Sequence, residues 1–87
     1  MVEHDFKKQR FQYEQNEAPA VLKYKILIDP KSGQHTVDFY STFVPESLRG
    51  KGIAEKLVRT GLKWANEQNH EITASCWYVE KFLRKKK

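Results

Sequence analysis

The chain has 87 residues, a formal net charge of +5 and one cysteine. This length fits a single domain, residues 1–87, with a core of marginal size, and a lone cysteine excludes an internal disulfide. No apolar run is long enough for a signal peptide or a membrane span, so we expect a cytoplasmic protein without a membrane partner.

Basic residues crowd the C-terminal end of the chain. They are Lys81, Arg84, Lys85, Lys86 and Lys87. Such a run is usually a solvated tail, and the rest of the chain is close to neutral. A small basic nucleic-acid-binding domain is therefore only a minor alternative.

The first half of the chain predicts antiparallel strands. Residues 10–15 alternate apolar and polar side chains, residues 20–28 give the clearest strand pattern, and residues 36–44 are rich in aromatic and β-branched residues. Residues 29–33 have the composition of a hairpin turn. Residues 1–5 carry no periodic signal, so we predict a meander of three strands.

The second half changes to a helical period, which runs from Ser47 or Leu48 to about residues 68–70. Its two apolar rows are Ile53, Leu57, Gly61 and Trp64, and Ala54, Val58, Leu62 and Ala65. Residues 72–76 predict a fourth strand, which a right-handed crossover would place parallel to the third. Residues 77–85 predict a short amphipathic helix. The predicted fold class is α/β (α+β).

A glycine loop precedes the long helix. Arg49, Gly50, Lys51 and Gly52 stand between the third strand and the first helical row. A helix start presents unpaired N–H groups and a partial positive charge, and the glycines allow close approach. The two basic side chains add cationic donors. The loop therefore predicts a pyrophosphate site, with an ordinary helix cap as the alternative.

Two common phosphate-binding loops do not fit this spacing. The P-loop pattern needs Ser or Thr where this chain has Gly52, and glycine where it has Pro45. The dinucleotide pattern needs a third glycine or alanine where Glu55 stands. A nucleoside triphosphatase and a dinucleotide-binding domain are therefore excluded.

Cys76 ends the predicted fourth strand. Parallel third and fourth strands should diverge where the helix begins, so we expect the glycine loop and Cys76 to face one crevice. A thiolate there is a candidate acyl acceptor, and a small buried hydrophobic residue is the other interpretation. His4, His35 and His70 lack ligand spacing, so no metal site is predicted.

The loop resembles the acetyl-CoA pyrophosphate loop of the GNAT acetyltransferase superfamily, whose signature is Q/R-x-x-G-x-G/A. The match runs through Leu48, Arg49, Gly50, Gly52 and Ala54. Nearly the whole chain resembles the small stand-alone YjdJ-like subgroup, including the segment 75–79 after the fourth strand. One departure is Ser41, where members of the subgroup often carry a histidine.

The resemblance implies acetyl-CoA as the cofactor, with loop amides at the pyrophosphate and the preceding strand at the pantetheine and thioester. The residues implied in binding are Phe43, Val44, Leu48, Arg49, Gly50, Lys51, Gly52, Ile53 and Ala54. It also makes Cys76 a candidate catalytic residue. Tyr78 is the nearest candidate proton donor to the leaving CoA thiolate.

The sequence thus predicts an acetyl-CoA-dependent N-acetyltransferase acting on an unidentified amine. Transfer through Cys76 and direct transfer both remain open. A non-catalytic acyl-CoA-binding module is the alternative, because Ser41 cannot act as a base at neutral pH and acceptor-contacting elements are short or absent. An edge strand offers a place for a second copy, so the expected state is a monomer or a weak dimer.

Overall fold

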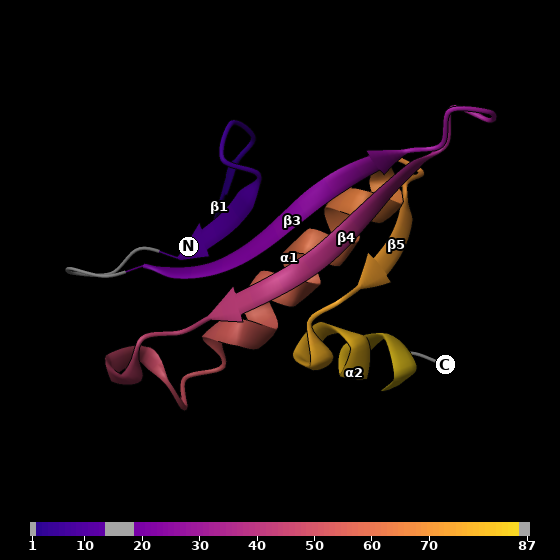
Figure 1. The fold of residues 1–87 in the computed structure, drawn as a ribbon. Coiled ribbons are helices and arrows are strands. Elements are labelled where there is room, and N and C mark those ends of the chain that lie inside the picture. Colours follow the sequence, from indigo (N-terminus) through magenta and orange to yellow (C-terminus); the bar gives the residue numbers. More distant parts are fainter. Residues whose placement is uncertain (1, 14–18, 86–87) are drawn as a thin grey trace.

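The computed structural model describes residues 2–13 and 19–85. Its elements are β1 (Val2–Asp5), β2 (Arg10–Tyr13), β3 (Ala20–Ile28), β4 (His35–Phe43), η1 (Glu46–Leu48), α1 (Ile53–Glu67), β5 (Glu71–Ala74) and α2 (Trp77–Lys85). One sheet has the order β1-β2-β3-β4-β5, antiparallel up to β4 and parallel between β4 and β5 (Figure 1). The predicted mixed α/β fold, with its meander and crossover helix, is confirmed.

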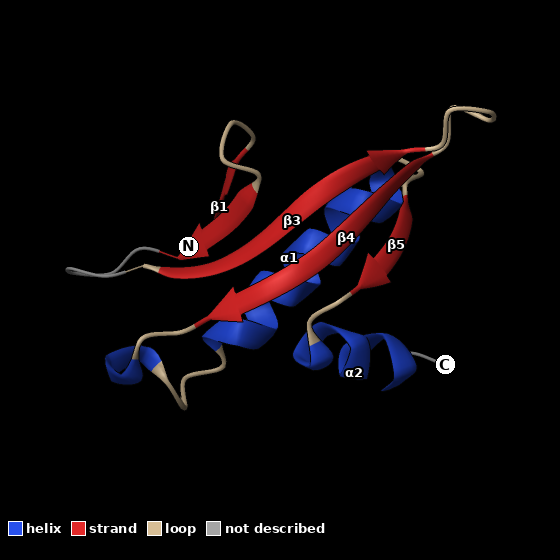
Figure 2. Ribbon diagram, in the orientation of Figure 1, coloured by secondary structure: helices blue, strands red, loops and turns tan. Residues whose placement is uncertain are grey.

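The helix α1 covers one face of the sheet and makes the crossover from β4 to β5 (Figure 2). Its buried side chains come from the two predicted rows. The shared core contains Ile53, Leu57, Val58, Leu62 and Ala65 of α1 and Phe11, Leu22, Tyr24, Val37 and Phe39 of the strands. Among the described residues, neither helix has the combination of length and apolar character that crossing a membrane requires.

The strand β1 was not predicted. It pairs antiparallel with β2, and His4 packs on the core side as an aromatic ring. The His4 ring stacks on Phe11 with 4.1 Å between ring centroids, and its Nε2 lies 2.5 Å from the Tyr24 hydroxyl. The alternation of this strand depends on a polar residue that behaves as an apolar one, which is why the sequence pattern does not reveal it.

The helix α1 begins later than predicted. Ser47 and Leu48 belong to the short 3-10 helix η1, and Gly52 is the N-cap of α1. Gly50 and Gly52 have φ angles of 81° and 74°, which a right-handed helix cannot contain. The glycines therefore end one helical turn and delay the next to Ile53. The predicted strand 10–15 is seen to Tyr13, and its last two positions lie outside the described residues.

The strands β4 and β5 part before β4 ends. Their parallel pairing stops at Phe39 and Ala74, whereas β4 continues to Phe43. Tyr40 bulges from β4 between the pairs that Phe39 and Ser41 make with β3. A bulge bends its strand and increases its twist. The end of β4 thus leaves the parallel pair and leads toward the glycine loop.

Candidate active site

A cavity of about 220 Å³ lies between the glycine loop and the first turn of α2. Its lining residues are Val44, Leu48, Arg49, Gly50, Gly52, Ile53, Ala54, Glu55 and Tyr78. The residues predicted to bind acetyl-CoA are all in this lining except Phe43 and Lys51. Phe43 is 52% exposed, and Lys51 is also exposed.

Gly50 and Gly52 keep the rim of this cavity open. Both adopt the left-handed backbone conformation, which glycine reaches without steric cost. A Cβ atom at either position would meet no heavy atom within 4 Å. Because the protein itself does not fill this space, the loop backbone is accessible to a ligand.

The cavity combines a helix N-terminus with one cationic side chain and one carboxylate. Arg49 Nε donates to the Val44 carbonyl over 3.0 Å, which ties the loop to the end of β4. Glu55 Oε2 is paired with Arg59 at 2.5 Å, so its charge is partly balanced from outside the cavity. The positive end of α1 and Arg49 therefore favour an anionic group in front of the loop.

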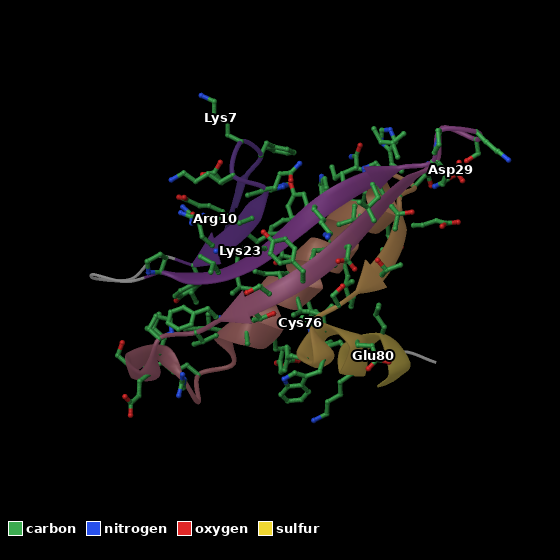
Figure 3. All side chains as sticks on the ribbon, viewed as in Figure 1. Lys7, Arg10, Lys23, Asp29, Cys76 and Glu80 are labelled. Carbon is green, nitrogen blue, oxygen red and sulfur yellow. The ribbon has the colours of Figure 1, made fainter. Side chains whose placement is uncertain are left out.

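Cys76 is the residue that leads into α2, and not the last residue of the strand as predicted. The chain turns after β5, and the Ser75 and Cys76 amides both donate to the Phe39 carbonyl over 3.1 and 3.2 Å. The Cys76 carbonyl accepts from the Glu80 amide over 3.0 Å. The Cys76 thiol lies 3.5 Å from Thr42 Oγ1. Figure 3 shows Cys76 between the end of β5 and α2, beside β4.

The surroundings of Cys76 favour its thiolate form. Burial raises the pKa of the thiol, but hydrogen bonds from the Thr42 side chain and from the Val79, Tyr78 and Thr42 backbone lower it, and the net result is a pKa below the ordinary value. Backbone N–H groups at a helix N-terminus stabilise an anion at this position. At a given pH, a larger fraction of the Cys76 thiol is therefore ionised than of an ordinary cysteine.

The side chain of Tyr78 lines the loop cavity, and its backbone lies at the Cys76 thiol. Tyr78 stands two residues after Cys76, in the first turn of α2. Burial and the nearby charge of Glu55 raise the pKa of the Tyr78 hydroxyl. Because a phenol already titrates far above neutrality, Tyr78 keeps its proton at pH 7. It is available there as a hydrogen-bond or proton donor.

The glycine loop and Cys76 meet different positions near the end of β4. Cys76 meets Thr42, whereas the cavity lining starts at Val44. Two residues of extended chain span about 7 Å. An extended ligand that follows the free end of β4 would pass from the loop to the thiol.

Two residues of this region were missed by the sequence prediction. Thr42 contacts the thiol, and Asp38 is a buried acidic residue on β4, only 5% exposed. Asp38 accepts hydrogen bonds from the Thr73 and Ser75 hydroxyls. The available signal was a single acidic residue between Val37 and Phe39 in an otherwise apolar part of the strand.

A larger groove of about 930 Å³ lies between α1 and α2. It shares Glu55 and Tyr78 with the loop cavity, and it extends to Leu62 and Phe82. The glycine loop and Cys76 do not line it. Of the two, only the smaller cavity contains residues of the glycine loop, and Cys76 lines neither.

Residues 10–87 match the family model of the GCN5-related N-acetyl-transferases. The chain is 34% identical over 85 residues to Protein NATD1 from Xenopus tropicalis, and 35% identical over 85 residues to Protein NATD1 from Danio rerio. Both alignments cover 95% of this chain and 73% of the relative. Protein NATD1 from Homo sapiens is 33% identical over 85 residues, covering 95% of this chain and 71% of the relative.

Two solved structures have a similar fold. A ribosomal-protein-alanine N-acetyltransferase from Brucella melitensis biovar Abortus 2308 has a TM-score of 0.68 and 17% identity, covering 87% of this chain and 59% of that one. The aminoglycoside acetyltransferase meta-AAC0020 from an uncultured soil metagenomic sample has a TM-score of 0.66 and 18% identity, covering 91% and 57%. The chain thus spans less than two thirds of either neighbour, and the likeness concerns the fold alone.

Proposed function

Because the chain belongs to the GCN5-related N-acetyltransferase family, we propose that it binds acetyl-CoA at the glycine loop and transfers the acetyl group to an amine. The observation that carries this proposal is the open glycine cavity, joined by the free end of β4 to a thiol with a lowered pKa. When bound, acetyl-CoA supplies an activated acetyl thioester.

The loop fits the pyrophosphate of such a ligand. The open glycine backbone permits close approach, and the first N–H groups of α1 lack intrahelical partners. Arg49 adds a cation at the same cavity. Phe43 ends β4 and Val44 follows it, so both lie along the chain between Thr42 and the loop, where the arm that carries the thioester would run.

We assign the nucleophile to Cys76. Its thiolate attacks the thioester carbonyl carbon, a new carbon–sulfur bond forms, and the bond to the CoA sulfur breaks. Tyr78 donates a proton to the departing sulfur. An amine then attacks acetyl-Cys76, the amide forms, and Cys76 leaves as a thiolate. The proton released by the amine returns through solvent to the Tyr78 phenolate.

The covalent route suits this chain because a strong base is lacking at the position occupied by Ser41. A thiol with a lowered pKa ionises more readily, and its thiolate needs no base for its own attack. The acceptor amine then requires only loss of its proton to solvent. Small polyamines, protein N-termini and lysine side chains all fall within this acceptor class.

Intact-mass spectrometry after incubation with acetyl-CoA tests this route. We expect one added acetyl group that hydroxylamine removes, and no such adduct on Cys76→Ala. Adding an amine should discharge the wild-type adduct and yield the acetylated amine. An adduct of equal yield on Cys76→Ala would contradict the assignment of the nucleophile.

The second candidate function is a non-catalytic acyl-CoA-binding module, and Ser41 in place of histidine is the observation that favours it. This function predicts binding of acetyl-CoA without an adduct and without acetylation of small amines, N-terminal peptides or lysine peptides. Binding together with turnover of any of these amines would exclude it.

A further inference from the structure

Asp38 is a buried acidic residue whose carboxyl group has both oxygens engaged. Oδ1 accepts from Thr73 Oγ1 over 2.7 Å, and Oδ2 accepts from Ser75 Oγ over 2.9 Å. A carboxyl group that only accepts hydrogen bonds has the pattern of a carboxylate, and hydrogen bonds to a carboxylate are stronger than neutral ones. Asp38 thereby holds two hydroxyl groups from one short segment.

The cost of burying a carboxylate suggests a specific role for this side chain. A buried charge is tolerated only when its oxygens are satisfied, and an apolar residue would fill the same space more cheaply. Lys25 is the cross-strand partner of Asp38 in β3, but within residues 2–13 and 19–85 the two form no ion pair. The carboxylate is therefore committed to the two hydroxyls.

The segment that Asp38 holds ends at Cys76. Thr73 is on β5, and Ser75 follows it in the turn toward α2. The neighbouring β4 residue, Phe39, receives the Ser75 and Cys76 amides on its carbonyl. Two consecutive residues of β4 thus attach the segment 73–76, one through its side chain and one through its backbone.

We propose that Asp38 is a positioning residue, which holds the turn at Ser75 so that the Cys76 thiol stays at the N-terminus of α2 and beside Thr42. The contact between the thiol and Thr42 joins two segments that no longer pair as strands, since the β4–β5 pairing ends at Phe39. Asp38 and Thr73 form the pair next to Phe39 and Ala74, the last pair before that separation. The inference rests on the proposed role of Cys76.

The pH profile of Cys76 alkylation by iodoacetamide tests this inference without acetyl-CoA. Cys76 is the only cysteine of the chain, so the signal belongs to it alone. Positioning predicts that Asp38→Asn moves the midpoint to higher pH and slows alkylation at neutral pH by about three- to tenfold, since one pKa unit is roughly tenfold in thiolate fraction. Removal of a nearby negative charge alone would move the midpoint the other way.

Ser75→Ala removes one hydroxyl and keeps the carboxylate, and Ser75 is exposed, so this variant tests the same bond without a buried change. We expect the same direction of shift. The double variant should shift the midpoint no further than Asp38→Asn does, because Ser75→Ala removes only a hydrogen bond that Asp38→Asn already weakens. Glu71→Gln, which removes a charge from the exposed start of β5, is the matched control and should leave the profile unchanged.

An unchanged or lowered midpoint in folded Ser75→Ala and Asp38→Asn overturns the inference, and so does a double variant whose shift is the sum of the two. If Asp38→Asn does not fold by circular dichroism, Ser75→Ala decides. Loss of acetyl-CoA binding would leave this readout intact, so failure of the proposed function and failure of this inference are distinguishable.

Discussion

His4 and Asp38 are polar residues placed among apolar neighbours, and each is accommodated by specific contacts. The His4 ring lies between Phe6 and Phe11, with ring centroids 3.8 and 4.1 Å away, and its Nε2 meets the Tyr24 hydroxyl. The ring packs β1 against the core residues Phe11 and Tyr24. The charge state of His4 should therefore affect the stability of the fold.

Burial lowers the pKa of His4, and the charge of Asp5 opposes this shift more weakly. A lowered pKa means that the folded protein binds the proton less readily than the unfolded chain does, so acidification favours unfolding. We expect the free energy of unfolding to fall as the pH drops through and below roughly 6.5, the ordinary histidine range. Urea unfolding at several pH values measures this change.

His4→Phe keeps a ring in the stack and removes the titrating group, so it should flatten the pH dependence in that window. His35 lies outside the stack on His4, so the control variant His35→Gln should retain the pH dependence of stability. An equal acid-induced loss of stability in His4→Phe would show that other groups are responsible.

The residues of the candidate site differ in how far sequence could place them. Val44, Leu48 and 49–54 form a local segment, so their joint position at one cavity follows from chain order and the glycines, with Lys51 as the exception. Cys76 and Thr42 are 34 positions apart, and their contact depends on where β4 and β5 separate. Asp38 resembled an ordinary strand position, because its hydroxyl partners are found only once the parallel register is known.

At the scale of elements, the close packing of α1 on the sheet depends on Gly61, a glycine inside the helix. Gly61 is buried in the middle of the helix, where glycine is intrinsically unfavourable. Its position is explained by the sheet beneath it, since a Cβ would lie 3.0 Å from Phe39 Cε1 and 3.1 Å from Leu22 Cδ2. The helix thus approaches the sheet more closely than a larger residue allows.

Gly61→Ala should destabilise the protein by about 1 kcal/mol, because overpacking costs about 1–3 kcal/mol and alanine regains only about 1 kcal/mol of helix propensity. Urea unfolding monitored by circular dichroism gives the difference. Thr60→Ala, at the exposed neighbouring position, is the control and should be neutral or slightly stabilising. Stabilisation by Gly61→Ala would mean that Phe39 and Leu22 move aside freely.

The elements themselves were largely predictable, because each follows a clear period. The strand Ala20–Ile28 and the apolar rows of α1 required only alternation and helical spacing. The predicted start of α1 was several residues too early. The helical spacing of apolar residues includes Leu48, but the positive φ angles at Gly50 and Gly52 are incompatible with a right-handed helix. The strand β1 was missed, because its pattern depends on the packing of His4.

At the scale of the whole molecule, the sheet and the crossover helix place the glycine loop and Cys76 near the same end of β4. In the proposed function, the glycine loop after β4 binds acetyl-CoA. The Cys76 thiol lies where β5 turns into α2. The chain spans 59% and 57% of the two structural neighbours. Its proposed reaction therefore depends on a small set of residues along the free end of β4.

Calorimetric titration of acetyl-CoA into the native protein, Gly50→Glu and Gly33→Glu tests the central claim most directly. Gly50 and Gly33 have positive φ angles of 81° and 75° with open space in front of them, so the two changes introduce the same charge and comparable backbone strain. Of these two glycines, Gly50 lines the loop cavity and Gly33 does not. We predict that the native protein and Gly33→Glu bind alike, and that Gly50→Glu loses at least about tenfold, or 1.4 kcal/mol, in affinity. Equal binding by all three proteins, or by none of them, would contradict acetyl-CoA recognition at this loop.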